Sequence, residues 1–264
     1  MLFDSFDYDS YFESLKIFLS VNENLCFDEI SHVHPGQRYF ILRHDVDFDP
    51  GIALRMAQLE AERGIRSTYF ILLTSPYYNL LIGENRRVPR QLVELGHKVG
   101  LHYDIIDLSL SGENQVLTEF KFQISILSEL AGSEIKMICA HNPSLSSDDP
   151  FKRSDEFINA ADSKFTTDIT YLSDSCGAWR DEAIDIFKSG IIPERLQLLI
   201  HPFYWNDRPE DRWQIIENFQ NESVRNIKDR IAYCKAVWSA HPGVKQHDRR
   251  KRIIRTKGNY HKNK

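Results

Sequence analysis

The chain has 264 residues, of which 42% are apolar, 12% aromatic and 27% charged. This is the composition of a folded globular protein with a sizeable core, and it excludes a disordered chain, collagen and a coiled coil. The sequence holds no run of about 18 uncharged apolar residues, and its N-terminal segment carries acids where a secretory signal would carry bases. We therefore expect a cytoplasmic location.

Apolar stretches that suit buried strands recur along the chain, separated by segments with helical periodicity. We expect strands at residues 38–42, 68–73, 98–101, 135–140, 166–172 and 197–200. Between the first two, a helix should run from Pro50 to Arg63, with Asp49 as its N-cap. The apolar face of that helix is predicted to consist of Ile52, Met56 and Leu59.

A second helix is expected over residues 113–131, which have the clearest amphipathic pattern. Near the end of the chain another apolar stripe, which we expect to be core, is formed by Val224, Ile227, Ile231, Cys234 and Trp238. Strands alternating with helices at least five times predict an α/β fold with mostly parallel strands, open or closed into a barrel. The simplest division is one domain over residues 1–243, followed by a basic tail over 244–264.

The net charge of −5 combines two unlike parts. From Lys245 to Lys264 there are nine Lys or Arg and one acid, so this segment carries +8 and residues 1–244 carry −13. A basic segment of this kind suits transient contact with an anionic membrane surface, here the inner face of the cell membrane. No nucleic-acid-binding fold accompanies it, so we expect no nucleic acid partner.

Aspartate or histidine stands at or just after the end of five expected strands. In chain order these residues are Asp45 and Asp47, His102 and Asp104, His141, Asp174 and His201. One such residue alone more often caps the next helix. Because the carboxyl ends of parallel strands open on one face, five together predict a chemical site there.

Asp45 and Asp47 stand two positions apart, so on an extended strand both carboxylates point to the same side. They repel each other there unless a cation or a proton lies between them. A metal ion resolves the repulsion, and histidine together with aspartate favours Zn²⁺, with Co²⁺, Mn²⁺, Fe²⁺ or Ni²⁺ as alternatives. His44 alternates to the other face, where we expect a structural role, and His97 is expected to cap an element or lie at the surface.

A family resemblance is carried by six motifs in order: HDVD (44–47), STYFIL (67–72), ELGHKVGLH (94–102), HNPS (141–144), DSCGAW (174–179) and LLIHP (198–202). Together they resemble the polysaccharide deacetylase superfamily (carbohydrate esterase, NodB homology), and within it cytoplasmic members associated with bacterial surface polysaccharide and O-antigen biosynthesis. The resemblance spans residues 38–205. It implies a distorted (β/α) barrel of seven or eight strands, and metal-assisted removal of an N-acetyl group from an amino sugar.

The resemblance also implies roles for the charged residues. Asp45 matches the catalytic base, and either Asp47 or Asp45 matches the metal-binding carboxylate. His102 matches the first histidine of the second motif, but Ile106 stands where its partner histidine is expected. Either His141 or Asp104 must then replace that ligand. Our working metal set is Asp47, His102 and His141.

Towards the other end of the resemblance, His201 matches the general acid and Asp174 the carboxylate that orients it. Trp179, with Tyr204 or Trp205, matches an aromatic groove wall. The substrate-binding candidates are Arg43, Ser144 through its backbone N–H, Trp179, Leu199 in the acyl pocket, and Tyr204.

The predicted substrate is therefore an amino sugar that is nucleotide-linked, lipid-linked or part of a polymer. Two alternatives stay open: a catalytically inactive glycan-binding protein of the same fold, motivated by Ile106, and an amidohydrolase acting on a non-sugar amide.

Overall fold

The computed structural model describes residues 2–240, apart from 111, 113–114 and 143–148. The chain divides into two compact units, residues 1–210 and residues 211–264. The boundary predicted at residue 243 lies outside the described residues and stays a prediction.

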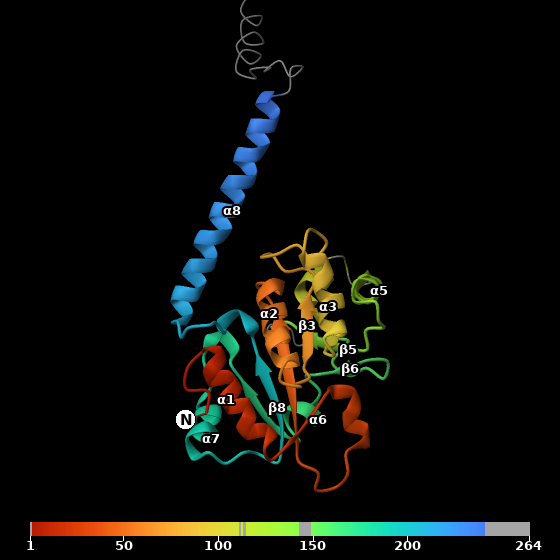
Figure 1. Ribbon diagram of the computed structural model, residues 1–264. Coiled ribbons are helices and arrows are strands. Elements are labelled where there is room, and N and C mark those ends of the chain that lie inside the picture. The colour runs from red at the N-terminus through yellow and green to blue at the C-terminus, as the bar shows by residue number, and fades with distance from the viewer. Residues whose placement is uncertain (1, 111, 113–114, 143–148, 241–264) are drawn as a thin grey trace, which may run out of the picture. The chain divides into compact units, whose positions relative to one another are not determined.

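The first unit is built on a curled sheet of parallel strands with helices around it (Figure 1). The strands are β1 (Glu23–Leu25), β2 (Tyr39–Val46), β3 (Thr68–Leu72), β4 (Lys98–Tyr103), β5 (Met137–Ala140), β6 (Ile158–Asn159), β7 (Thr170–Ser173) and β8 (Arg195–Ile200). Their order is β6-β5-β4-β3-β2-β8-β7, with β1 paired to the start of β2. The predicted α/β class, a distorted (β/α) barrel with parallel strands, is confirmed.

Helices connect the strands. They are α1 (Tyr8–Leu19), α2 (Pro50–Ala61), α3 (Val88–Glu94), α4 (Ile105–Leu110), α5 (Val116–Ala131), α6 (Ser163–Thr166), α7 (Asp181–Ser189) and α8 (Arg212–Ala240). Helix α2 begins as predicted, because the Asp49 carboxylate accepts a hydrogen bond from the Gly51 amide at 2.7 Å and Pro50 occupies its first turn. None of the described helices is both long and apolar enough to cross a bilayer.

Strand β2 positions the site because its side chains alternate between two buried environments. All eight of its residues are buried. Tyr39 and Ile41 pack inside the curl of the sheet, on the side that also receives Arg43 and Asp45. His44 points the other way and contacts Glu60 of α2. The predicted structural role of His44 is therefore confirmed.

Glycine at position 100 allows β4 to lie close to its neighbours. A Cβ atom there would come within 2.5 Å of the Phe70 ring and 2.9 Å of the Met137 carbonyl oxygen. Only glycine fits without shifting β3 or β5. This close approach sets the position of His102, two residues further along the same strand.

Two expectations about buried surfaces hold only in part: of the predicted α2 face Met56 is buried, and for His97 the surface alternative is wrong. The buried face of α2 contains Ala53, Met56, Ala57 and Glu60. The carboxylate of Glu60 is buried there, whereas Leu59, which the apolar pattern predicted to be buried, is only partly covered. His97 is not at the surface: it is 2% exposed and its Nε2 donates to the Ala57 carbonyl oxygen at 2.9 Å.

The described part of the second unit is helix α8. Its apolar stripe, expected as core, is exposed in its main members: Val224 is 44%, Ile227 59%, Ile231 49% and Trp238 65% exposed. No other described residue of the second unit covers this stripe, so within this unit it does not form a core.

Candidate functional site

The predicted strand-end residues converge where β2, β4, β5 and β8 finish. The register places His102 beside Cys139 of β5 and Arg43 beside Leu199 of β8. Asp47 follows β2 directly, and His141 follows β5. Residues up to 154 positions apart in sequence, from Asp47 to His201, thus face one another.

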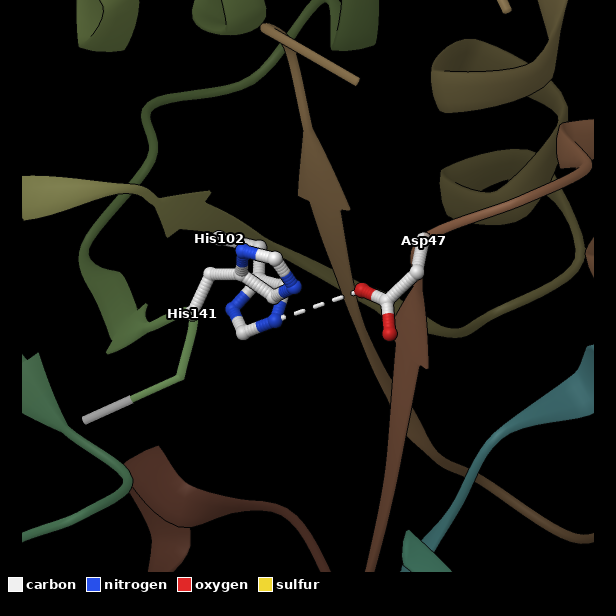
Figure 2. A group of neighbouring side chains, drawn as sticks. All are labelled: Asp47, His102 and His141. Carbon is white, nitrogen blue, oxygen red and sulfur yellow. Dashed lines mark ion pairs between the residues drawn. The ribbon is translucent and has the colours of Figure 1, made fainter. Parts of the chain in front are cut away.

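Asp47, His102 and His141 form a compact group that could hold a metal ion. One ligand atom from each lies within 4.8 Å of the others, and Figure 2 shows both imidazoles beside the Asp47 carboxylate. His102 Nε2 is 3.4 Å from Asp47 Oδ1, and the two histidine rings are 5.2 Å apart at 75°. The group offers one oxygen and two nitrogen donors, which suits Zn²⁺ or a similar divalent ion.

Two features of this group fit a cation. The buried Asp47 Oδ1 makes no well-formed hydrogen bond among the described residues, and its nearest charged neighbour is His102 Nε2 at 3.4 Å; a buried carboxylate oxygen so weakly paired is costly. Burial alone would lower the pKa of His102, but Asp45 and Asp47 outweigh it and raise this pKa well above its usual value. The carboxylates of Asp45 and Asp47 therefore stabilise a positive charge at the position where a metal cation would bind.

Neighbouring groups orient both histidines. His102 Nδ1 lies 3.0 Å from the Cys139 carbonyl oxygen and donates to it, so Nε2 is the ring atom that faces the site. His141 Nδ1 lies 3.1 Å from Asp104 Oδ2. Two residues were candidates to replace the ligand that is missing at Ile106. His141 belongs to the metal-ligand group, whereas Asp104 contacts the His141 ring and is not a member of that group.

Substituting Asp104 should therefore weaken metal binding without removing a ligand. We expect Asp104→Asn to lower metal affinity by about 10–100-fold, because the His141 ring loses the carboxylate that fixes its orientation. Asparagine keeps the cap of α4, where Asp104 Oδ1 accepts from the Ile106 amide. Competition with a chromogenic chelator measures the affinity. The exposed Asp107→Asn on the same helix is the control, and equal affinities for the two variants would refute the role of Asp104.

Asp45 is held by a buried ion pair. Arg43 Nε donates to Asp45 Oδ1 at 2.8 Å and Arg43 Nη2 to Asp45 Oδ2 at 2.6 Å, with both residues 4% exposed. Burial would raise the pKa of Asp45, but Arg43, together with His102, holds it well below its usual range. Asp45 is thus ionised and fixed, with Oδ2 at 3.5 Å from His102 Nε2.

His201 forms a second arrangement opposite the metal-ligand group. Its Nδ1 lies 2.6 Å from Asp174 Oδ1, and Asp174 is fully buried and accepts a further hydrogen bond from Trp205 Nε1 at 2.8 Å. Burial would lower the pKa of His201, but Asp174 and Asp47 raise it to about 9. The Nε2 atom of His201 points toward Asp47 Oδ2 at 3.8 Å. A protonated imidazole with a free N–H therefore faces the candidate metal ligands.

The predicted substrate residues lie in different environments. Leu199 is 3% exposed on β8, and Tyr204 is 7% exposed with its ring 6.4 Å from that of His201. Trp179 packs against Phe3 and Phe187 at 5.3 and 4.8 Å. The other candidate for the aromatic wall, Trp205, is fully buried. The Ser144 backbone lies outside the described residues.

An aromatic stack lies beside Asp47, and its members Phe48 and Phe203 were not identified from the sequence. The Phe48 ring lies 4.5 Å from that of Tyr77 and 4.2 Å from that of Phe203, with interplanar angles of 16° and 17°. Ser75 Oγ donates to the Asp47 carbonyl oxygen at 2.7 Å and ties this loop to the site. Tyr77 is 54% exposed. Two sequence signals point to this surface: Phe48 is adjacent to Asp47, and Tyr77 lies in an aromatic segment that follows the second expected strand.

No protein-family profile and no curated protein matches the sequence. Among solved structures, the chain is similar to a peptidoglycan deacetylase of Bacillus subtilis, with 13% identity and a TM-score of 0.46 over 79% of this chain and 100% of that one. A polysaccharide deacetylase of Bacillus cereus follows at 12% identity and a TM-score of 0.46, over 72% of this chain and 89% of that one.

A family 4 acetyl xylan esterase of Clostridium thermocellum, solved with a cobalt ion, has 14% identity and a TM-score of 0.43 over 72% of this chain and 84% of that one. At such identities and TM-scores the activities of these enzymes do not transfer to this chain. The functional proposal therefore depends on the geometry of the site.

Proposed function

We propose that this protein is a metal-dependent hydrolase that removes an N-acetyl or other N-acyl group from an amino sugar. The observation that carries the proposal is the placement of Asp47 between two sets of residues: a ligand group with His102 and His141, and a protonated His201 paired with Asp174. A divalent ion in the ligand group would polarise the acyl oxygen and lower the pKa of a water molecule.

The chain's own residues supply the proton transfers. Asp45 is the candidate to accept a proton from the attacking water, and Arg43 keeps its carboxylate ionised and oriented. An amine leaves only when it is protonated, so a general acid is required on the other side of the scissile bond. His201 fills this role because its pKa of about 9 keeps it protonated at neutral pH. Asp174 fixes the ring through Nδ1 and leaves the Nε2 proton for the amine.

The substrate class is supported by the aromatic stack next to Asp47. The Tyr77 ring, which is 54% exposed, offers an apolar surface to the face of a sugar ring, and Phe48 supports it from within the stack. The motif order in the sequence extends the proposal to surface polysaccharide or O-antigen biosynthesis in the cytoplasm, with Zn²⁺ as the first candidate metal. On this proposal the sugar is nucleotide-linked, lipid-linked or polymeric.

Metal analysis of the purified protein tests the proposal. We expect about one equivalent of a divalent metal in the wild type, and a loss of most of it in His102→Ala and in His141→Ala, since each removes one of three protein ligands. His32→Ala, which removes an exposed histidine elsewhere, should keep its metal. Release of acetate from N-acetylglucosamine oligomers should fall in parallel. Unchanged metal content in both ligand variants would contradict the assignment.

A second candidate function is glycan binding without turnover. It is favoured by Ile106, which stands where the family resemblance expects a histidine and is 49% exposed. Binding of the oligomers with no acetate release from fully metal-loaded protein would select this alternative.

A further inference from the structure

Helix α8 carries an exposed apolar stripe that the proposed function does not use. Along its residues 224–240, an apolar residue recurs at steps of three or four, which places these side chains on one face: Val224, Ile227, Ile231, Cys234 and Trp238. All but Cys234 are more than two-fifths exposed. A stripe of this kind on a helix requires a partner surface.

The charges around the stripe show which partner fits. At 3.6 residues per turn, Arg230 lies on one edge of the stripe, and Lys228 and Lys235 lie on the other edge, each within about 80° of its centre. The acids Glu222 and Asp229 fall on the opposite face. All of these side chains are exposed. The apolar surface is thus bordered by cations on both sides.

A second copy of this helix is a poor partner for the stripe. In a parallel or an antiparallel pair of helices, the residues that flank the seam face their counterparts across it. Here the flanking charges from Lys228 to Lys235 are all positive, so self-association would place like charges opposite each other. A negatively charged surface, by contrast, would pair with them.

We propose that α8 is a membrane-surface helix that lies on an anionic lipid bilayer, with Ile227, Ile231 and Trp238 in the interfacial region and the flanking cations at the lipid phosphates. A tryptophan at the end of such a stripe suits the headgroup level. The sequence that follows adds nine Lys or Arg and one acid between Lys245 and Lys264, and this charge acts in the same direction. The proposal is independent of the catalytic function.

Sedimentation of the full chain with lipid vesicles tests this proposal. The protein should bind vesicles that contain phosphatidylglycerol, bind phosphatidylcholine vesicles weakly, and dissociate from the anionic vesicles as salt is raised. Ile227→Gln/Ile231→Gln should weaken binding by about tenfold or more, since it removes apolar area without changing charge. The matched control is Ala232→Gln/Ala236→Gln on the opposite, exposed face, which should bind within about twofold of the wild type.

Two results would overturn the proposal. One is equal vesicle binding by the stripe pair and the control pair, which would leave the basic segment as the sole attachment. The other is a dimer in vesicle-free buffer that the stripe pair converts to a monomer, which would assign the face to a second copy of the chain. Retained helical circular dichroism and an unchanged metal content show that a variant is folded, and they separate this test from that of the proposed hydrolase.

Discussion

Replacing His201 with Asn should lower kcat by about 10²–10⁴-fold, the usual contribution of a positioned general acid. Asparagine keeps a polar group but cannot deliver a proton to a leaving amine. The metal content should stay the same, because His201 is 3.8 Å from Asp47 and lies outside the ligand group. Acetate release at saturating oligomer is the measurement, and a variant that retains more than a tenth of the wild-type kcat would remove His201 from this role.

The pH dependence of kcat tests the same assignment. The pKa of His201 is raised from 6.5 to about 9, so the acid form prevails at neutral pH and is lost as pH rises through about 9. A cation bound beside Asp47 would offset part of the negative charge that raises this pKa, so the alkaline limb should lie at or below about pH 9. Asp174→Asn should shift that limb to lower pH.

The same shift is linked to stability. Because the folded pKa of His201 lies above 6.5, the contribution of this group to stability is fully present below pH 6.5 and disappears as pH rises through about 9. Loss of stability and loss of activity on the alkaline side would thus overlap, so the activity profile must be measured on protein shown to be folded at each pH.

Glu60→Gln should lower the free energy of unfolding by about 3–5 kcal/mol, which is typical when one partner of a buried ionic network is removed. Glu60 is fully buried on α2. Its carboxylate contacts His44 Nε2 at 2.8 Å and accepts hydrogen bonds from the Ser67 and Tyr69 hydroxyls at 2.7 and 2.8 Å, and from Tyr11 at 2.5 Å. Glutamine has one acceptor oxygen and an NH₂ group that faces donors.

Urea unfolding at neutral pH measures this loss. The control is Glu62→Gln, at the exposed C-cap residue of the same helix, and its free energy of unfolding should lie within about 0.5 kcal/mol of that of the wild type. Burial would raise the pKa of Glu60, but His44 and the other contacts lower it from 4.5 to about 2. Its contribution is therefore complete above pH 4.5 and lost as pH falls through about 2. The variant should show less acid dependence in that range, and a wild-type-like profile would refute the role of the network.

Much of the site could be predicted because the position of a residue along a strand determines on which side of the sheet its side chain points. Asp45 lies with Arg43 inside the curl while His44 points toward α2, as two-residue alternation requires. The gathering of His102 and His141 followed from parallel strands that end on one face. Patterns of this kind depend on the backbone alone.

What the sequence could not predict depends on side chains that meet across elements. Glu60 looks like a solvent-facing residue on an amphipathic helix, and its partners come from α1, β2 and β3. The pairing of Asp104 with His141 likewise joins residues 37 positions apart. The stripe on α8 has the periodicity of a core helix, yet periodicity alone does not say whether a partner surface belongs to the same chain.

The Asp47 carboxylate would take part in both metal binding and proton binding. Its two oxygens face different imidazoles, Oδ1 toward His102 and Oδ2 toward His201, so proton occupancy and ion occupancy share one carboxylate. The raised pKa of His102 means that an incoming cation competes with a proton already held between Asp45 and Asp47. Loading would release that proton to solvent, so acidification alone would favour the empty site. If the group binds a cation as proposed, the fraction of protein that holds the ion would therefore fall as the proton concentration rises.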